Sequence, residues 1–417
     1  AQETEKNHED ILEQADETDA VFGELYSWYL RNPEYRSRIQ KLVQSAFAGK
    51  PKDIISQSVA KALYGEVSPY SATRLERFAA CAFAHFLQYG MKLTERVEYE
   101  FKPMDMGNVM HEALESFAEE VRKRGMKWTE LTEQERNEIA DRCLDNIVAD
   151  YGNTVLKSSA RNEYMIERTR RILRRTVWAL QKQLEQGEFQ PEGFEVTFGG
   201  GRIDRVDIME DQNKVYVKVI DYKTGNTSFD LVYLYHGLQL QLMIYLDGAL
   251  RVEQKKYPDK EIIPAGVFYY NIKDPMIQEK IDADVEAVSA GLMKELKMNG
   301  LVQADPELVY RMDSSLGSIP VAFNKDGNFR KNSSVADRTQ FAVLGRYVRT
   351  KIEKIRSSIL EGDAEVSPYE LGKKNACTYC PYMTVCGFDR RLSGYEFRRL
   401  KNFSDEELWK AFDREAE

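Results

Sequence analysis

Asp204, Asp221 and Lys223 are the residues whose types and spacing could best support chemistry in this chain, in the pattern Asp-x(16)-Asp-x-Lys. Side chains alternate along a strand, so Asp221 and Lys223 point the same way. A divalent metal that prefers oxygen ligands needs carboxylates from more than one segment. A lysine beside them can orient a nucleophilic water or neutralise charge on a phosphate. The pattern therefore predicts a metal-dependent phosphodiesterase.

Two more segments accompany these strands in a fixed order. His111 closes Gly107-Asn108-Val109-Met110-His111 upstream, and Gln241 and Tyr245 follow downstream in Gln241-Leu242-Met243-Ile244-Tyr245. With Ile203-Asp204 and Asp221-Tyr222-Lys223, the chain resembles the PD-(D/E)xK nuclease superfamily and, within it, the RecB-like exonucleases. The resemblance implies that His111, Asp204 and Asp221 bind Mg²⁺ and that Lys223 positions the attacking water. Gln241 and Tyr245 would lie beside the metal and position DNA or the lysine.

Other interpretations of these residues stay open. Asp221 and Lys223 also fit a surface salt bridge, and a lone histidine such as His111 is more often a packed side chain than a ligand. Gln241 and Tyr245 share a helix face and could simply cap a core helix, with Gln239 as the alternative glutamine. Asp207 should face away from Asp204; we expect it to pair with Arg202 or Arg205, with metal binding as the alternative. The basic helix Arg168–Lys182 either contacts phosphates or forms a solvated face.

Four of the five cysteines form a candidate cofactor site. Cys377, Cys380 and Cys386 make a C-x2-C-x5-C run, and Cys81 lies far upstream. Four thiolates are a ligand set for a [4Fe-4S] cluster or for structural zinc. One distant cysteine plus a C-terminal triplet resembles the iron–sulfur site of AddB-type nucleases, which implies a [4Fe-4S] cluster that joins the two ends of the nuclease domain.

Ala82 departs from that family, in which proline commonly follows the first cysteine; the change affects the backbone and not the ligand. Zinc and an isolated, buried Cys81 remain the alternatives to a cluster. His85 is the only alternative ligand nearby, and Cys143 is interpreted as a core or surface thiol.

The composition indicates a globular protein that can bury a large core in two or three domains. Of its 417 residues, 42% are hydrophobic and 30% are charged, and no apolar run suggests a membrane helix. The net charge of −9 argues against coating of DNA along the whole surface, but a nuclease channel needs only a local basic lining. The polar, acidic start without Met and without a signal peptide suggests a C-terminal piece of a longer protein.

The elements that position these residues follow from hydrophobic periodicity. We expect strands at 194–198, 202–208, 215–222 and 266–272, and helices at 72–87 with Ser71 as N-cap, at 107–124 with Gly125 as its stop, and at 237–252 and 340–360. Residues 225–235 should form a loop. Residues 199–201 are either a tight glycine turn or a place where a longer connection is missing.

The fold class is therefore α/β: a restriction-endonuclease-like core with a central mixed sheet, large helical additions and a C-terminal iron–sulfur site. We expect a helical tail of a preceding helicase-like region at 1–65, the nuclease domain at 66–392 and a C-terminal helical tail at 393–417. The best match is the C-terminal nuclease domain of AddB-type subunits of bacterial AddAB helicase–nucleases.

That match implies a cytoplasmic, Mg²⁺-dependent exonuclease that cuts single-stranded DNA during double-strand break repair, with an AddA-like motor subunit as partner and no membrane. The chain has no G-x-x-x-x-G-K-[ST] motif for ATP. The alternatives are a stand-alone RecB-like or CRISPR-type exonuclease, an inactive iron–sulfur scaffold that binds DNA, and a zinc-bound interaction module.

Overall fold

The computed structural model of the chain describes residues 20–47, 54–65, 70–94, 103–150, 159–199, 201–277, 284–392 and 394–416. The chain forms two compact units, Ala1–Asp53 with Gly387–Glu396 and Ile54–Cys386 with Phe397–Glu417. The first unit contains α2 (Pro33–Phe47), in agreement with the helical expectation there, although residues 1–19 and 48–53 lie outside the described part. The second unit holds every candidate site residue. Among the described residues, no helix has the length and apolar character needed to cross a membrane.

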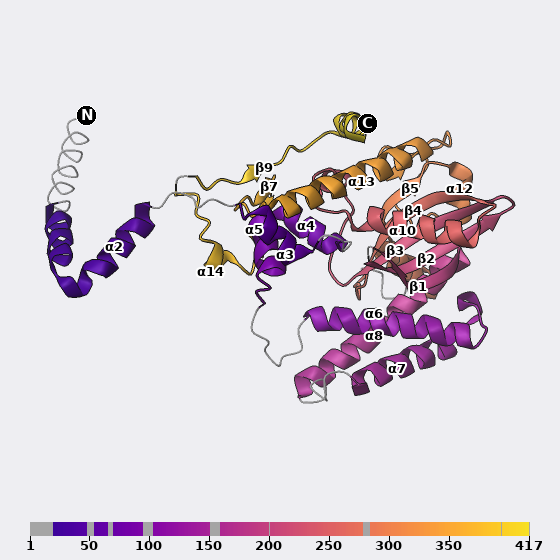
Figure 1. Ribbon diagram of the computed structural model, residues 1–417. Coiled ribbons are helices and arrows are strands. Elements are labelled where there is room, and N and C mark those ends of the chain that lie inside the picture. The colour runs from indigo at the N-terminus through magenta and orange to yellow at the C-terminus, as the bar shows by residue number, and fades with distance from the viewer. Residues whose placement is uncertain are drawn as a thin grey trace, which may run out of the picture. The chain divides into compact units, whose positions relative to one another are not determined.

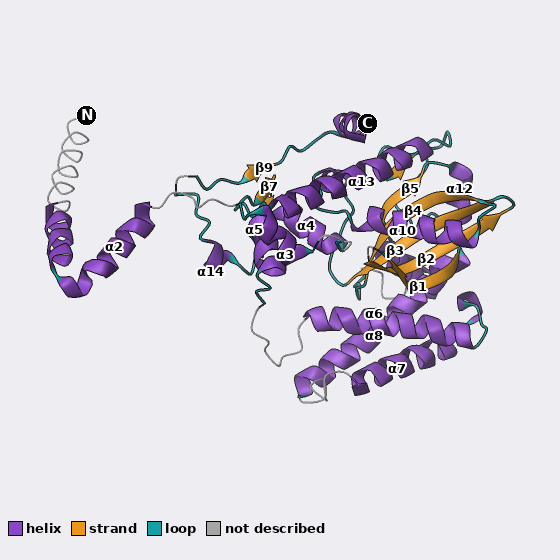
Figure 2. Cartoon of the chain, viewed as in Figure 1, coloured by secondary structure: helices purple, strands orange, loops and turns teal. Residues whose placement is uncertain are grey.

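A six-stranded mixed sheet forms the centre of the second unit (Figures 1 and 2). Its strands follow chain order: β1 (Gln190–Phe198), β2 (Gly201–Asp211), β3 (Lys214–Lys223), β4 (Glu261–Asn271), β5 (Asn299–Gln303) and β6 (Val335–Ala336). The β3–β4 and β5–β6 pairs are parallel and the other pairs are antiparallel. The α/β fold class with a mixed sheet is thus confirmed, and the four predicted strands are present with longer bounds.

The hairpin between β1 and β2 has a loop of two residues, because Phe198 pairs with Gly201. Gly201 has φ +150°, a value that favours glycine. This short connection fits the tight-turn interpretation of the glycine run, while Gly200 itself lies outside the described residues.

Helices cover both faces of the sheet. The longer ones are α3 (Gln57–Tyr64), α4 (Ala72–Ala80), α6 (Pro103–Lys123), α7 (Glu133–Asp150), α8 (Ala160–Glu185), α10 (Gln241–Lys256), α11 (Val285–Glu295), α13 (Arg338–Glu361) and α15 (Asp405–Ala416). The shorter ones are α5 (Ala82–His85), α9 (Leu231–Tyr235), α12 (Pro306–Met312) and α14 (Met383–Cys386). α9 lies inside the segment expected to be a loop, and the helices expected at 107–124, 237–252 and 340–360 are α6, α10 and α13.

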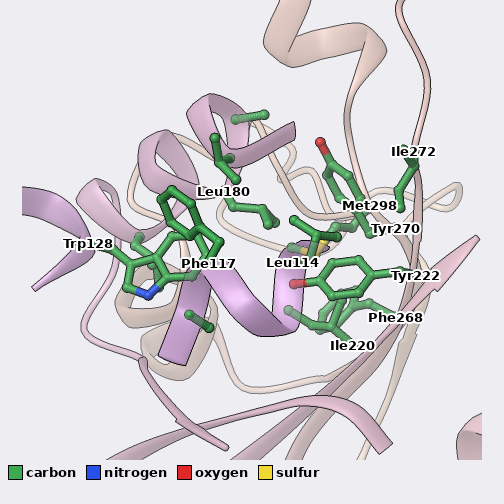
Figure 3. Close-up of a cluster of buried hydrophobic side chains, with 14 of the residues drawn as sticks. Leu114, Phe117, Trp128, Leu180, Ile220, Tyr222, Phe268, Tyr270, Ile272 and Met298 are labelled. Carbon is green, nitrogen blue, oxygen red and sulfur yellow. The ribbon is translucent and has the colours of Figure 1, made fainter. Parts of the chain in front are cut away.

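Two hydrophobic clusters fill the space between the sheet and its helices. One joins α6, α7 and α8 to the sheet, and Figure 3 shows its centre, where Leu114 of α6 lies beside Ile220 and Tyr222 of β3. The other joins the sheet to α4, α10, α13 and α15. Ile220 and Tyr222 point into the first cluster, while Val219 belongs to the second. This alternation turns the side chains of Asp221 and Lys223 away from the α6 layer.

The predicted helix over 72–87 is wrong in its extent. It begins as expected, with the Ser71 hydroxyl accepting from the Arg74 N–H at 3.4 Å, but α4 ends at Ala80. Cys81 has extended backbone angles, φ −166° and ψ 118°, and α5 starts after it. The apolar periodicity continues through residue 81, so the interruption comes from tertiary contacts: the Phe83 N–H donates to the Glu365 carbonyl.

A small sheet, β8-β7-β9, closes the C-terminal part of this unit. Its strands are β7 (Tyr369–Leu371), β8 (Lys374–Asn375) and β9 (Arg398–Arg399). Arg398 donates a hydrogen bond to the carbonyl of Ala79, the second-last residue of α4. The segment around the cysteine triplet is therefore attached to the end of α4, where Cys81 lies.

Candidate active site

Asp204 and Asp221 lie opposite each other on adjacent strands. Arg205 pairs with Ile220 in the antiparallel β2–β3 ladder, so the next pair in this register is Asp204 with Asp221. Directly opposed side chains of such a pair have Cβ atoms about 4.5–5.5 Å apart and share a face. The backbone N–H of Tyr222 donates to Asp204 Oδ2 at 2.7 Å, which fixes the orientation of that carboxylate.

His111 and a residue that sequence reasoning missed, Glu195, complete a possible metal site with Asp204. One ligand atom from each of the three lies within 4.8 Å of the others, and His111 Nδ1 is 3.4 Å from Asp204 Oδ2. Glu195 stands between the pairs Phe194–Arg205 and Val196–Ile203, and thus across the ladder from Asp204. A two-residue turn at 199–200 would place Glu195 opposite Asp204. The glycine run was therefore the sequence signal that could have revealed Glu195.

The backbone of Glu195 is strained. Its φ of +49° is in the left-handed region, which a glutamate rarely adopts. Strain of this kind is kept where surrounding structure demands a particular side-chain direction, as at ligand sites. The carboxylate also forms an ion pair with the exposed Arg202, so Arg202 neutralises part of the charge near His111 and Asp204.

Lys223 is held by a chain of polar contacts that reaches α10. Its Nζ lies 2.5 Å from Asp221 Oδ2 and donates to Gln241 Oε1 at 2.8 Å. Gln241 Nε2 in turn donates to the Tyr245 hydroxyl at 2.8 Å. The alternative glutamine, Gln239, instead accepts from the Asp230 N–H and donates to the Ser228 carbonyl. The structure thus brings Gln241 to the lysine and uses Gln239 to support the loop before α10.

Glu76 of α4 is a second residue that sequence reasoning missed. Its Oε1 accepts from the backbone N–H groups of Leu240 at 2.7 Å and Gln241 at 3.0 Å, at the start of α10. These N–H groups have no partner within their own helix, and a carboxylate there also interacts favourably with the helix dipole. No local pattern could reveal this contact, because Glu76 caps a helix that lies more than 160 residues further along the chain.

Crowded carboxylates give the site a strong preference for a cation. Burial and then the neighbouring Asp204 raise the pKa of Asp221 to about 7, against the opposing effect of Lys223. The same two causes raise the pKa of Glu195 to about 7. Burial works against protonation of His111, but the hydrogen bond and charge of Asp204 outweigh it and raise the pKa of that histidine.

These residues fit a divalent cation that prefers oxygen. Asp204, Glu195 and His111 bring two carboxylates and one imidazole together, with Asp221 opposite Asp204 on the next strand, and hard cations such as Mg²⁺ are bound through carboxylate oxygens. Asp221 is 1% exposed, and its Oδ2 lies 2.5 Å from the Nζ of Lys223, so this buried carboxylate already has a cationic partner in the lysine.

Asp207 lies outside this group, as expected from its odd spacing. Arg205 donates to both carboxylate oxygens, at 2.6 and 2.9 Å, and Lys218 Nζ lies 3.0 Å away. All three side chains are buried. The expectation that Asp207 pairs with Arg205 is therefore confirmed, while Arg202 pairs with Glu195.

Two of the four candidate cysteines meet near the end of α4. Cys81 and Cys380 belong to one hydrophobic cluster with Tyr382. Burial, followed by the charges of Cys81, Cys380 and Cys386, raises the pKa of Cys377 to about 12. His85 is instead buried between Tyr64, Phe78 and Tyr89 and accepts from Arg74, and Cys143 is buried in the α6–α7–α8 core.

The basic stretch of α8 is largely engaged by acidic neighbours. Arg170 and Arg174 form ion pairs with Asp141 of α7, and Arg171 pairs with Asp274. These contacts fasten α8 to α7 and to the end of β4. They favour the solvated, structural interpretation of this stretch.

Comparison with known proteins agrees with this geometry. Residues 69–387 match the PD-(D/E)XK nuclease superfamily. The chain is 41% identical over 421 residues to the B subunit of the ATP-dependent helicase/deoxyribonuclease of Lachnoclostridium phytofermentans, covering 95% of this chain and 36% of that protein. It is 34% identical to the proteins of the same name from Thermoanaerobacter sp. strain X514 and Alkaliphilus metalliredigens, covering 96% and 95% of the chain and 37% of each relative.

The chain thus spans little more than a third of the length of these relatives. The expected resemblance to AddB-type subunits is confirmed. Because the superfamily match covers most of the sequence and includes every residue of the site described above, the chain belongs to the PD-(D/E)XK nuclease superfamily.

Proposed function

We propose that this chain is the nuclease domain of a B-type subunit of a helicase–nuclease and hydrolyses phosphodiester bonds of single-stranded DNA. The observation that carries the proposal is the arrangement of Asp204 opposite Asp221, with Lys223 held between Asp221 and Gln241. The name of the relatives, which calls them part of a helicase/deoxyribonuclease, supports DNA as the substrate.

In this proposal His111, Asp204 and Asp221 hold Mg²⁺, and Glu195 adds a fourth donor. When bound, the cation supplies a Lewis acid for the phosphate and lowers the pKa of a water molecule. Asp204 is kept in position by the Tyr222 N–H. Asp221 has a second task, since it also attracts the ammonium group of Lys223.

Lys223 contributes a positive charge in a fixed place. Gln241 accepts from its Nζ and Asp221 Oδ2 lies 2.5 Å from it, so one of the three ammonium hydrogens remains for a water or for a phosphate oxygen. Gln241 also donates to Tyr245, so one amide fixes both neighbours. A displacement of about 1 Å in such a group can lower a rate about 100-fold, so the Glu76 cap that holds the start of α10 supports the position of Gln241.

A [4Fe-4S] cluster on Cys81, Cys377, Cys380 and Cys386 is the second cofactor that we propose. The electrostatic proximity of Cys377 to the other three thiols supports it. Four thiolates are equally a ligand set for a structural zinc ion, so metal content decides between the two.

We further propose that the chain works as a Mg²⁺-dependent exonuclease in processing double-strand breaks, together with an AddA-like motor subunit in the bacterial cytoplasm. The names of the relatives support such a partnership. In this proposal residues 1–65 are the tail of a helicase-like region, 66–392 the nuclease domain and 393–417 a C-terminal helical tail.

Cleavage of end-labelled single-stranded DNA with Mg²⁺ tests the nuclease. We expect Asp221→Ala and Lys223→Ala each to lose at least about 100-fold in rate, the usual size for removing one charged group that stabilises a transition state. Asp259→Ala and Lys331→Ala, at exposed positions, are the matched controls. Equal cutting by all five proteins would place the activity elsewhere, and no cutting even with the motor subunit added would favour an inactive scaffold.

Metal content tests the cysteine site. Protein purified without oxygen should be brown and contain about four iron atoms per chain and little zinc. Cys377→Ser should lose the iron, whereas Cys143→Ser should keep it, because Cys143 lies in a different core. Stoichiometric zinc in place of iron would establish the zinc alternative.

A further inference from the structure

A basic groove runs between α10 and α13. It has two adjoining lobes, with volumes of about 630 and 360 Å³, that share Met243, Asp247, Gly345 and Arg349 in their walls. The larger lobe is also bordered by the tip of the β1–β2 hairpin, Thr197–Gly199. We call the two lobes together the α10–α13 groove; none of its residues was used in the site described above.

Positive charge is concentrated along this groove. Among the described residues of its lining the only acidic one is Asp247, and the basic ones are Arg251, Lys255, Arg338, Arg346, Arg349 and Arg356. Arg338 and Arg356 also form ion pairs with Glu261 and Glu353 just outside the lining, so Lys255 and Arg346 are the basic residues best placed to meet a ligand. The whole chain carries a net charge of −9, so the basic lining of the groove contrasts with the negative charge of the protein as a whole. A local basic lining attracts anions even when the net charge of the protein is negative.

Asp247 organises the middle of the groove. Its Oδ1 accepts from Arg349 at 2.8 Å, and its Oδ2 lies 2.7 Å from Arg251 Nη2. One carboxylate therefore holds two guanidinium groups, from α13 and α10, which remain 51% and 68% exposed. Because Asp247 carries only one negative charge, the pair keeps a net positive charge in a fixed geometry.

The larger lobe has an apolar floor, and Phe198 in its lining connects the lobe to the network that holds Lys223. Ile244, Val348 and Ile352 line this floor. Phe198, at the hairpin tip, contacts the Tyr245 ring edge-on at 5.9 Å between centroids. Gly248 permits this position, because a Cβ there would lie 2.6 Å from the Phe198 ring. Tyr245 bonds to Gln241 and so connects this lobe to Lys223.

We propose that the α10–α13 groove binds the stretch of single-stranded nucleic acid that flanks the scissile phosphate. Its basic rim contacts successive phosphates, and its apolar floor and Phe198 accept unstacked bases. The inference rests on the proposed nuclease function for its direction, since Phe198 in the lining of the groove contacts Tyr245, but binding itself needs no chemistry.

The groove has a basic rim and an apolar floor, and this combination favours a single strand over other ligands. Single strands present both phosphates and free base faces, and proteins that bind them combine a positive groove with apolar or aromatic platforms. A duplex hides its base faces and would leave the floor of Ile244, Val348 and Ile352 unused. An acidic segment of another protein would use the rim but offers no base faces to the apolar floor.

Charge reversal at one residue of each lobe tests the groove. Lys255→Glu with Arg346→Glu changes two exposed positions and leaves the Asp247 bridge intact. Lys325→Glu with Lys331→Glu, in an exposed turn outside the groove, changes the net charge equally. Binding of a fluorescein-labelled oligothymidylate of about 15 nucleotides is measured by anisotropy in EDTA, where no cleavage occurs, at several salt concentrations.

We expect the groove variant to bind about tenfold more weakly, and its log–log salt dependence to be less steep by about 1.4, the value for two lost phosphate contacts on a single strand. The control variant should bind as the wild type does. Hydrolysis of bis(p-nitrophenyl) phosphate with Mn²⁺, a substrate too small to reach the groove, should be equal in all three.

Wild-type affinity in the groove variant, or an equal loss in both variants, would overturn the proposal and leave an acidic partner segment as the occupant. If the groove variant loses its helical circular dichroism, Lys255→Gln with Arg346→Gln is judged by the same criterion. If only the groove variant loses binding and the wild-type protein cleaves neither substrate, the proposed nuclease function is refuted. The proposal that the groove binds a single strand is supported in that case.

Discussion

Replacing Glu76 by glutamine should change the pH dependence of stability while keeping the structure of the site. Burial raises the pKa of Glu76 from its ordinary 4.5 to about 7. A carboxyl whose pKa is higher in the folded state ionises more readily in the unfolded chain, so the wild type loses stability as pH rises through that interval. Glutamine does not titrate, and its Oε1 can still accept from the N–H groups of Leu240 and Gln241.

The size of the effect follows from the two pKa values. Linkage between pH 5 and pH 8 gives about 2.5 kcal/mol for a group that shifts from 4.5 to about 7; this is an upper value, because Glu76 keeps some solvent exposure. The free energy of unfolding of Glu76→Gln, compared with wild type, should therefore rise by up to about 2.5 kcal/mol over this pH range.

Urea denaturation of both proteins in EDTA at pH 5 and pH 8 measures this difference. Glu76→Ala separates the two roles of the side chain: loss of the cap should cost about 0.5–2 kcal/mol at pH 5, and release of Gln241 should lower the nuclease rate by up to about 100-fold. A difference between glutamine variant and wild type that is the same at both pH values would refute the reasoning. So would full nuclease activity in the alanine variant.

Two further outcomes are expected. Asp207→Ala should destabilise the protein by about 3–5 kcal/mol, because it leaves Arg205 and Lys218 buried without their counter-ion. The two cations hold the pKa of Asp207 below its ordinary value against the effect of burial, so its contribution should be present above about pH 4 and be lost as pH falls below that value; acid titration of unfolding checks both statements. Glu195→Gln should weaken Mn²⁺ binding by at least about tenfold in calorimetry, whereas Glu192→Gln on the same strand should not, and equal affinities would remove Glu195 from the metal site.

Much of the fold could be predicted, because the relevant signals are local. The alternation of Val215, Val217 and Val219 with Tyr216 and Lys218 predicts a half-buried strand; β3 is present there, but it is buried on both faces because helices cover both sides of the sheet. Gly125, with φ +67°, follows α6 as predicted. The helix expected over 72–87 was wrong because apolar periodicity cannot register the extended backbone of Cys81, which depends on partners near residue 365.

The residues of the candidate site also fall into two groups, those that local patterns reveal and those that depend on contacts between distant segments. Asp204, Asp221, Lys223 and His111 were visible because motif spacing along strands and helices is a property of the chain itself. Glu195 was missed because it lies opposite Asp204 only if the β1–β2 loop has two residues, and the glycine run alone did not establish that loop length.

The sequence by itself determined which residue types are available and on which strands and helices they lie, since these depend on neighbours a few positions away. Only the tertiary structure decided that Gln241 and not Gln239 reaches Lys223, that Glu76 caps α10, and that basic residues of α10 and α13 line one groove. Each of these contacts joins segments far apart in the chain, and packing of the helices on the sheet sets them, which no local pattern encodes.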